Sequence, residues 1–512
     1  MLRYIMRRIA LAPLILFGST FLVYNLAAYA NDPLGELRLS TDDGARQQII
    51  ALTRDLNLDV PPPIRYFLWL KGILGIFIGK FDLGNTRSAT TVWEELAYAI
   101  PVSLRLVFVA TITALIIGLA LGIISALRQY SRFDYAMTFL AFLLFSLPIF
   151  WVAVLLKEFM AIQFNNFLSE PNIPIKWMIA FSLFTGLFWS SLFGGERKRF
   201  WSVFGGAFAT SFVILWAIDF TDWYLNPGLG IILIALLSVG IAFGVTAIST
   251  GLSNAAAKKA ALTMAGLAVV WYYPAQWIFN NFGSYFTIFI LISLIVLTGL
   301  GLSRVYSKID RGPIARTAII TGILSGFLIL VDRIMQSWND YSGTDAVNGR
   351  PVPTYGQRKD QLVTEDFWLN NLDIIMHLVL PTLALILISV AGWIRYTRGA
   401  LLEVLNQDYI RTARAKGLNE REVITRHALR NTMLPLSSLF VGEFLGLISG
   451  AVITERVFGW QGMGTLFLRG VNGGDPNLLM GVTLLFAVLT IFGNLLSDLV
   501  YSLLDPRIRL GK

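Results

Sequence analysis

The stretch IPVSLRLVFVATITALIIGLALGIISA, residues 100–126, decides the class of fold. Arg105 is its one charged residue, and about 20 mainly apolar residues suffice to span a bilayer as a helix. Similar runs recur along the 512 residues, of which 55% are hydrophobic and only 14% charged, against about 25% charged in soluble domains. We therefore expect an all-α polytopic membrane protein, because a chain this apolar cannot cover a globule with polar surface.

The apolar runs predict about twelve membrane-spanning helices. Glycine pairs four apart within the runs, such as Gly118/Gly122, Gly240/Gly244 and Gly322/Gly326, are typical of helix contacts. The predicted spans are approximately 9–30, 100–126, 135–163, 175–195, 200–219, 228–249, 261–280, 284–303, 314–333, 376–396, 434–454 and 480–503.

Basic residues set the predicted orientation, because loops rich in Lys and Arg stay in the cytoplasm. Alternation over twelve spans then places both termini in the cytoplasm of a cell (inner) membrane protein. The segments 31–99 and 334–375 fall outside, and an amphipathic helix is expected from Asp42 to Asn57. We expect 64–80 to be interfacial rather than spanning, since two lysines interrupt it. The basic segments predicted inside are 3–8, 128–132, 197–199, 258–259, 304–316, 395–430 and 507–512.

Several classes of site are excluded by composition. The chain has no cysteine and only two histidines, His377 and His427, which rules out thiolate chemistry and a histidine-rich metal site. No stretch supplies a Walker sequence. The net charge of +9 is explained by cytoplasmic loops, so we expect no nucleic-acid partner and no cofactor.

The charged loop DYIRTARAKGLNEREVITRHALRNTMLP, residues 408–435, carries the main functional signal. Its pattern predicts one helix from Ala400 to Lys416 and a second from Glu420 to Asn431. Gly417 closes the first helix in the left-handed conformation, and Asn419 is a suitable N-cap for the second. Pro435 is expected to mark the return of the chain to the membrane.

This loop resembles the EAA loop of ABC-importer permeases, and its ARAKGL and RHALRN stretches are similar to the oligopeptide/dipeptide/nickel branch. Ala413 and Gly417 match the family spacing, whereas Arg411 stands where a glutamate is usual and Pro435 comes five residues late. The resemblance extends over about 1–165 and 370–512. Its other parts are RRIALAPLILFGSTFLVYNLAAYANDP (7–33), LNLDVPPPIRYFLWL (56–70), FDLG (81–84), IPVSLRL (100–106) and DLVYSLLDPRIR (498–509).

The resemblance implies a six-helix permease core divided by about six inserted helices. The implied plan is an N-terminal helix (1–30), an external segment (31–99), two core parts (100–165 and 356–512) and an insertion (166–355). The insertion has no counterpart in the six-helix plan, and no motif indicates its function. Its even number of helices preserves the orientation of the core.

The resemblance also implies partners and roles. These are a homologous second permease subunit (a heterodimer is expected), two cytoplasmic ATP-binding subunits, an external substrate-binding protein and membrane lipid. The chain itself is then not an enzyme, because ATP is hydrolysed in the partners. Within the loop 400–433, the residues implied in coupling to the ATPase are Arg411, Ala413, Arg414, Lys416, Gly417 and Arg421.

Glu443 is the one carboxylate near the middle of a predicted span. Such a group faces either a pathway, where it favours cationic or amine-bearing substrates, or a neighbouring helix that hydrogen-bonds it. The expected cargo is a peptide or a similar polar oligomer, with nickel and oligosaccharides left open. The alternatives are an ion-coupled secondary transporter, which leaves the coupling loop unexplained, and a membrane enzyme, for which no set of catalytic residues is found.

Overall fold

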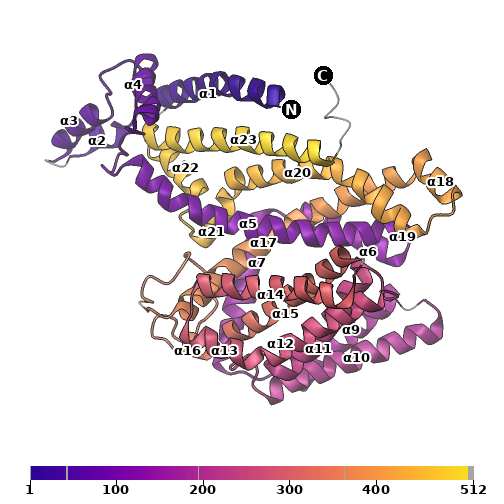
Figure 1. Cartoon of the computed structure of the whole chain (residues 1–512). Helices are drawn as coiled ribbons and strands as arrows, with labels where there is room; N and C mark the ends of the chain where they lie inside the picture. Colours follow the sequence, from indigo (N-terminus) through magenta and orange to yellow (C-terminus); the bar gives the residue numbers. More distant parts are fainter. Residues whose placement is uncertain are drawn as a thin grey trace. The chain divides into compact units, whose positions relative to one another are not determined.

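A computed structural model describes residues 2–504 apart from Asn31, Asp42, Asp43, Gly194, Ile309 and Val363. In this described part, regular structure is helical, and an isolated bridge between Asn85 and Thr91 is the only β contact (Figure 1). The basic tail predicted at 507–512 lies outside the described residues, as does the start of the helix expected from Asp42. The all-α architecture expected from the sequence is confirmed.

The chain divides into two compact units, which are described separately. Unit 1 comprises 1–160, 354–357 and 377–512, and unit 2 comprises 161–353 and 358–376. Two elements cross the boundary: the π-helical turn η2 (Lys157–Ile162) and the helix α17 (Phe367–Leu405).

Unit 1 contains the two chain ends and the charged loop. In it, α23 packs against α1 and α20, and α5 contacts α20, α22 and α23 (Figure 1). The elements that lie wholly in unit 1 are α1 (Leu2–Ala30), α2 (Gly35–Leu39), α3 (Ala45–Asp55), α4 (Pro62–Leu74), η1 (Gly75–Ile78), α5 (Val92–Leu127), α6 (Arg132–Ser146), α7 (Ile149–Leu156), α18 (Asp408–Ala415), α19 (Glu420–Glu422), η3 (Val423–Ala428), α20 (Leu429–Gly450), α21 (Val452–Phe458), α22 (Met463–Asn472) and α23 (Pro476–Leu504).

Unit 2 is a second helical bundle. The helices α11, α12, α14 and α15 pack on one another, and α9 pairs with α10. Its elements are α8 (Gln163–Ser169), α9 (Ile175–Phe193), α10 (Arg197–Phe220), α11 (Gly230–Ser249), α12 (Ala255–Val270), α13 (Tyr272–Asn281), α14 (Tyr285–Tyr306), α15 (Arg311–Gln336) and α16 (Trp338–Ser342).

By length and composition, nine helices of the described part can cross a membrane, or ten if one bent pair counts as a single span. That pair is α6 with the segment from Ile149 to Ser169, which the sequence predicts as one straight span over 135–163. The two parts meet at 99°. Pro148 explains the bend: it has no N–H to continue the helix, and Leu147 before it is extended, with φ −82° and ψ 128°.

The two remaining predicted spans are also interrupted. The span predicted over 261–280 is divided into α12 and α13 at Trp271. The span predicted over 434–454 corresponds to α20 followed by α21, with Ala451 between them. Neither interruption is visible in the apolar pattern, because hydropathy does not report where a helix is broken.

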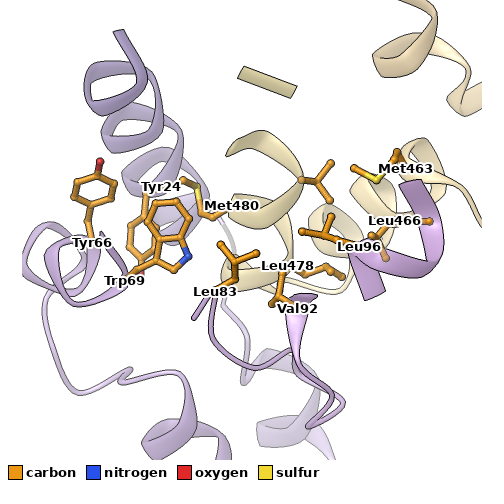
Figure 2. Packing of buried hydrophobic residues seen from close by; sticks show 12 residues of the cluster. Tyr24, Tyr66, Trp69, Leu83, Val92, Leu96, Met463, Leu466, Leu478 and Met480 are labelled. Atoms are coloured by element: carbon orange, nitrogen blue, oxygen red, sulfur yellow. The ribbon is translucent and has the colours of Figure 1, made fainter. Parts of the chain in front are cut away.

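A buried cluster joins the N-terminal and C-terminal parts of unit 1. Figure 2 shows Tyr24 of α1 with Tyr66 and Trp69 of α4 on one side, and side chains of α22 and α23 on the other. Tyr66 is fully buried, and its hydroxyl lies 2.9 Å from that of Thr20. The segment that contains α4 therefore folds back onto α1 and fixes it against α23.

In unit 2, the carboxylate of Asp332, near the end of α15, joins several segments of the chain by hydrogen bonds. Asp332 is 1% exposed, and such a buried charge is tolerated only when donors surround it. Its donors are the backbone N–H groups of Leu229 (2.6 Å) and Gly230 (3.1 Å), the hydroxyl of Tyr272 (2.8 Å) and the amides of Gln276 (3.1 Å) and Gln336 (2.8 Å).

Of the predicted glycine pairs, Gly118/Gly122 and Gly322/Gly326 allow close helix approach, whereas Gly446/Gly450 is not fully described. A Cβ at Gly118 would collide with Trp393 of α17, and one at Gly122 would lie 2.7 Å from Thr397. Gly322 and Gly326 are likewise in tight contact within unit 2. The prediction was wrong for Gly240 and Gly244, because no described atom lies within 4 Å of a Cβ at either position.

We predict that Gly118→Ala lowers the stability of the purified protein by about 1–3 kcal/mol, because the added methyl overpacks the contact between α5 and α17. Gly240→Ala is the matched control, with the same chemical change in an open position. The thermal unfolding midpoint in detergent checks the prediction. Equal midpoints for the two variants would contradict the close approach at Gly118.

Candidate functional site

The charged loop folds as two short helices joined at Gly417. This residue has φ +75°, and the N–H of Leu418 bonds the carbonyl of Ala413 at 3.4 Å, which closes α18. The side chain of Asn419 accepts the N–H of Arg421 at 3.2 Å and caps α19. The predicted conformation of Gly417 and the predicted N-cap are therefore both confirmed.

One side of the loop is buried against the membrane helices. Ile410 and Ala413 of α18 belong to a hydrophobic cluster with Ala126 at the end of α5 and Leu401 of α17. Of the six residues implied in coupling, Ala413 thus lies on the inner side. The other five are exposed. The helix α18 is therefore packed directly against the ends of α5 and α17.

Arg414 forms an ion pair within the loop. Its guanidinium donates to both carboxylate oxygens of Glu420, at 3.1 and 2.6 Å, across the turn at Gly417. This pair lowers the pKa of Glu420 below its usual range. A two-point contact of this kind holds the angle between α18 and α19.

The remaining charges of the loop are arranged along its exposed side. Arg426 pairs with Glu422 at 2.6 Å, while Arg411 lies 3.5 Å from Asp408 with 71% of its side chain exposed. Lys416 is also exposed. The loop therefore offers a basic, solvent-facing surface on a rigid backbone.

The sequence predicts that the second loop helix ends at Asn431, but in the structure it does not end there. Instead α19 continues through the π-helical turn η3 into α20, and Pro435 lies within α20. The hydroxyl of Thr432 bonds the carbonyl of Ala428 at 2.9 Å, and the side chain of Asn431 donates to Tyr409 of α18 at 2.8 Å. The loop is consequently continuous with α20.

Glu443 lies on α20, partly buried, against the side chains of Ser389 and Trp393 of α17. Trp393 is 2% exposed, and its indole N–H is next to the carboxylate. Of the two alternatives left by the sequence, this position favours a polar contact between neighbouring helices.

Unit 1 also contains a fully buried glutamate that sequence reasoning missed. Glu455 of α21 is fully buried and accepts the hydroxyl of Ser103 of α5 at 2.5 Å and the N–H of Thr465 of α22 at 2.9 Å. The hydroxyl oxygen of Ser103 in turn accepts the N–H of Met463 at 2.7 Å. We call Glu455, Ser103, Met463 and Thr465 the Glu455 network; it joins three helices.

Two glycines leave room for this network. A Cβ at Gly462 would collide with Glu455 and Ser103, and one at Gly464 would lie 2.7 Å from the backbone of Val452. An acid followed by two such glycines in ERVFGWQGMG is a usable signal. It was missed because the predicted span ended at residue 454, which left Glu455 outside it as an ordinary loop acid.

The C-terminal end of α21 is also fixed. The ammonium of Lys157 donates to the carbonyl of Val457 at 3.0 Å and lies over the ring of Phe458. The N–H of Gly356 bonds the carbonyl of Phe458 at 2.8 Å. Thus α21 is held at both ends by groups from distant parts of unit 1.

We predict that Glu455→Ala destabilises the protein by about 3 kcal/mol, because it leaves buried donors without an acceptor. Glu455→Gln keeps an acceptor and should cost less. The unfolding midpoints of both variants in detergent test this. An alanine variant as stable as the glutamine variant would contradict the network.

Comparison with known proteins gives a consistent family. Residues 118–510 match the family model described as binding-protein-dependent transport system inner membrane component. The chain is 26% identical over 511 residues to the oligopeptide transport system permease protein OppB of Mycobacterium tuberculosis, with both chains covered fully.

Shorter matches are more similar. The oligopeptide transport system permease protein AppB of Bacillus subtilis is 38% identical over 227 residues, which cover 43% of this chain and 66% of that protein. The di/tripeptide transport system permease protein DppB of Pseudomonas aeruginosa is 34% identical over 218 residues, covering 41% of this chain and 65% of that protein.

Proposed function

This chain belongs to the family of binding-protein-dependent transport system inner membrane components, the permease subunits of ABC importers, and on that premise we propose that it carries oligopeptides across the membrane. The observation that supports this cargo most directly is the naming of its relatives, which are permeases of oligopeptide and di/tripeptide transport systems. The chain is a multi-pass inner-membrane protein and a permease, not an ATPase.

We infer that both termini and the loop from Arg395 to Arg430 lie in the cytoplasm, where basic loops are retained. A second, homologous permease subunit completes the pathway, two ATP-binding subunits dock on the loop, and an external binding protein delivers the peptide. The support for these partners is the family plan together with the exposed basic surface of α18 and α19.

In the proposed mechanism, the ATP-binding subunits move α18 and α19 as one body. The Arg414–Glu420 ion pair and the left-handed Gly417 fix the angle between the helices. The buried residues Ile410 and Ala413 pass the displacement to α5 and α17. Rigid-body movement of packed helices then opens the bundle alternately to each side. An ion-coupled mechanism would leave this loop without a role.

We predict that Gly417→Pro abolishes peptide import and peptide-stimulated ATPase activity of the assembled transporter, because proline cannot adopt φ +75°. The measurement is peptide uptake and ATP hydrolysis in vesicles containing the full complex. Purification of the variant with its ATPase and an unchanged elution profile controls for folding. Normal import by the proline variant would refute the coupling role.

Charge exchange separates the structural from the recognition role of the pair. Arg414→Glu alone should reduce coupled transport at least tenfold, because it places two acids together. The double variant Arg414→Glu/Glu420→Arg restores an internal pair with reversed polarity. We expect this double variant to recover stability but not transport, since the surface presented to the ATPase has changed. Full recovery of transport would mean that the pair only stabilises the loop and does not contact the ATPase.

For Glu443, we propose that the carboxylate joins α20 to α17 through Ser389 and Trp393. Glu443→Gln retains polar contacts and should leave peptide import within about twofold of normal, whereas Glu443→Leu should lower the unfolding midpoint. Uptake of peptides with free and acetylated N-termini is the measurement. Selective loss of free-amine peptides in Glu443→Gln would instead assign Glu443 to the pathway.

A further inference from the structure

A cavity in unit 1 lies at the end of α5 remote from the charged loop. It has a volume of about 440 Å³ and is lined by the end of α1 (Ala27–Ala30), the segment that follows it, Arg65 of α4 and the turn between α22 and α23. The size lies within the range of small-molecule sites. Its lining includes two arginines and two aspartates, Arg38, Arg65, Asp32 and Asp475.

Arg65 is the unusual member of this lining. It is 7% exposed, and its guanidinium carbon lies 6.0 Å from the centre of the Tyr24 ring. No carboxylate of the described residues forms an ion pair with it, and its Nε has no hydrogen-bond partner there. A buried cation without a counter-ion is costly, and an adjacent aromatic ring offsets only part of that cost.

The acids of the cavity are already engaged elsewhere. Asp32 pairs with Arg38 at 2.8 Å. Asp475 accepts the N–H of Leu478 at 3.0 Å, which caps α23, and the N–H of Arg87 at 2.5 Å. The positive charge of Arg65 is thus left for an anion that comes from outside the chain.

The surroundings indicate where this anion comes from. The helix α4 and the turn η1 expose apolar side chains on one face, with Lys71 within this face and Lys80 just after it. Apolar side chains flanked by lysines are typical of a segment lying in the interface of an anionic membrane. The exposed apolar residues of α4 and η1 are Ile64, Phe67, Leu68, Leu74, Ile76, Phe77 and Ile78.

The end of α1 next to the cavity also exposes apolar side chains. Leu22, Leu26 and Tyr29 are 57%, 62% and 72% exposed on α1, a helix long and apolar enough to span a membrane. Tyr29 also lines the cavity. The exposed apolar face of α1 therefore runs up to the cavity that Arg65 lines.

We propose that this cavity binds the phosphate of an anionic membrane phospholipid, with Arg65 as the recognising cation and the acyl chains lying along α1. A guanidinium is well suited to this role, because it donates two parallel hydrogen bonds to a phosphate. The bound lipid supplies the missing counter-ion and secures α1 and α4 on α23. The site lies outside the coupling loop and does not depend on the identity of the transported cargo.

The test uses the full transporter complex, delipidated in detergent and then supplied with vesicles of phosphatidylcholine alone or with phosphatidylglycerol. Native mass spectrometry counts retained lipid, and the thermal unfolding midpoint reports stabilisation. We expect phosphatidylglycerol to be retained by the wild type and to raise its midpoint. Arg65→Met should reduce that retention at least tenfold and abolish the shift, while Arg65→Lys keeps part of both.

The matched control is Lys71→Gln/Lys80→Gln, which removes exposed charge nearby but leaves the cavity intact. It should retain the bound lipid. Arg65→Met without anionic lipid should be at least as stable as the wild type, because a buried charge has been removed, and this result also shows that the variant folds. If Arg65→Met does not fold, Tyr24→Phe, which leaves the charge, should weaken retention only slightly.

Two outcomes would overturn the proposal. One is equal retention of phosphatidylglycerol by Arg65→Met and the wild type. The other is a midpoint shift that inorganic phosphate or a peptide with a free carboxylate reproduces while phosphatidylglycerol does not. The second result would assign the cavity to a soluble anion or to the cargo.

Discussion

The hydrocarbon core of a membrane contains no water to pair with the backbone, so an unbonded N–H or C=O there costs several kcal/mol. This constraint accounts for the helical character of the described spans and also for the treatment of their interruptions. Where α21 ends and the chain turns into α22, side chains bond the backbone: Lys157 donates to the carbonyl of Val457, and Glu455 accepts the N–H of Thr465. An irregular segment is tolerated here because these backbone groups are satisfied within unit 1.

The difference between local and long-range contacts explains what the sequence could and could not predict. Apolar runs identify a polytopic helical protein, since hydropathy is a local property. Local signals were equally sufficient at Gly417 and Asn419, whose conformations depend on their immediate neighbours. By contrast, the 99° bend at Pro148 falls inside a continuous apolar run, where only the proline hints at it.

The missed site residues depend on contacts between distant parts of the chain. Glu455 acquires its role from Ser103, which lies 352 positions away in the sequence, and Arg65 from a ring on α1 and a turn near residue 475. Arg414 was correctly placed in the loop, but its pairing with Glu420 required the angle that Gly417 imposes. A single sequence gives the residue types of such sites without their partners.

The π-helical turn η3 between the charged loop and α20 has a mechanical consequence. A π turn holds one residue more than an α turn. Were Val423–Ala428 to tighten into a regular α-helix, every residue of α20 beyond it would rotate by about 100° about the helix axis and shift by about 1.5 Å along it. A small displacement of α19 would then rotate and shift α20 along its axis. Its side chains, including Glu443, would turn relative to α17 and α23.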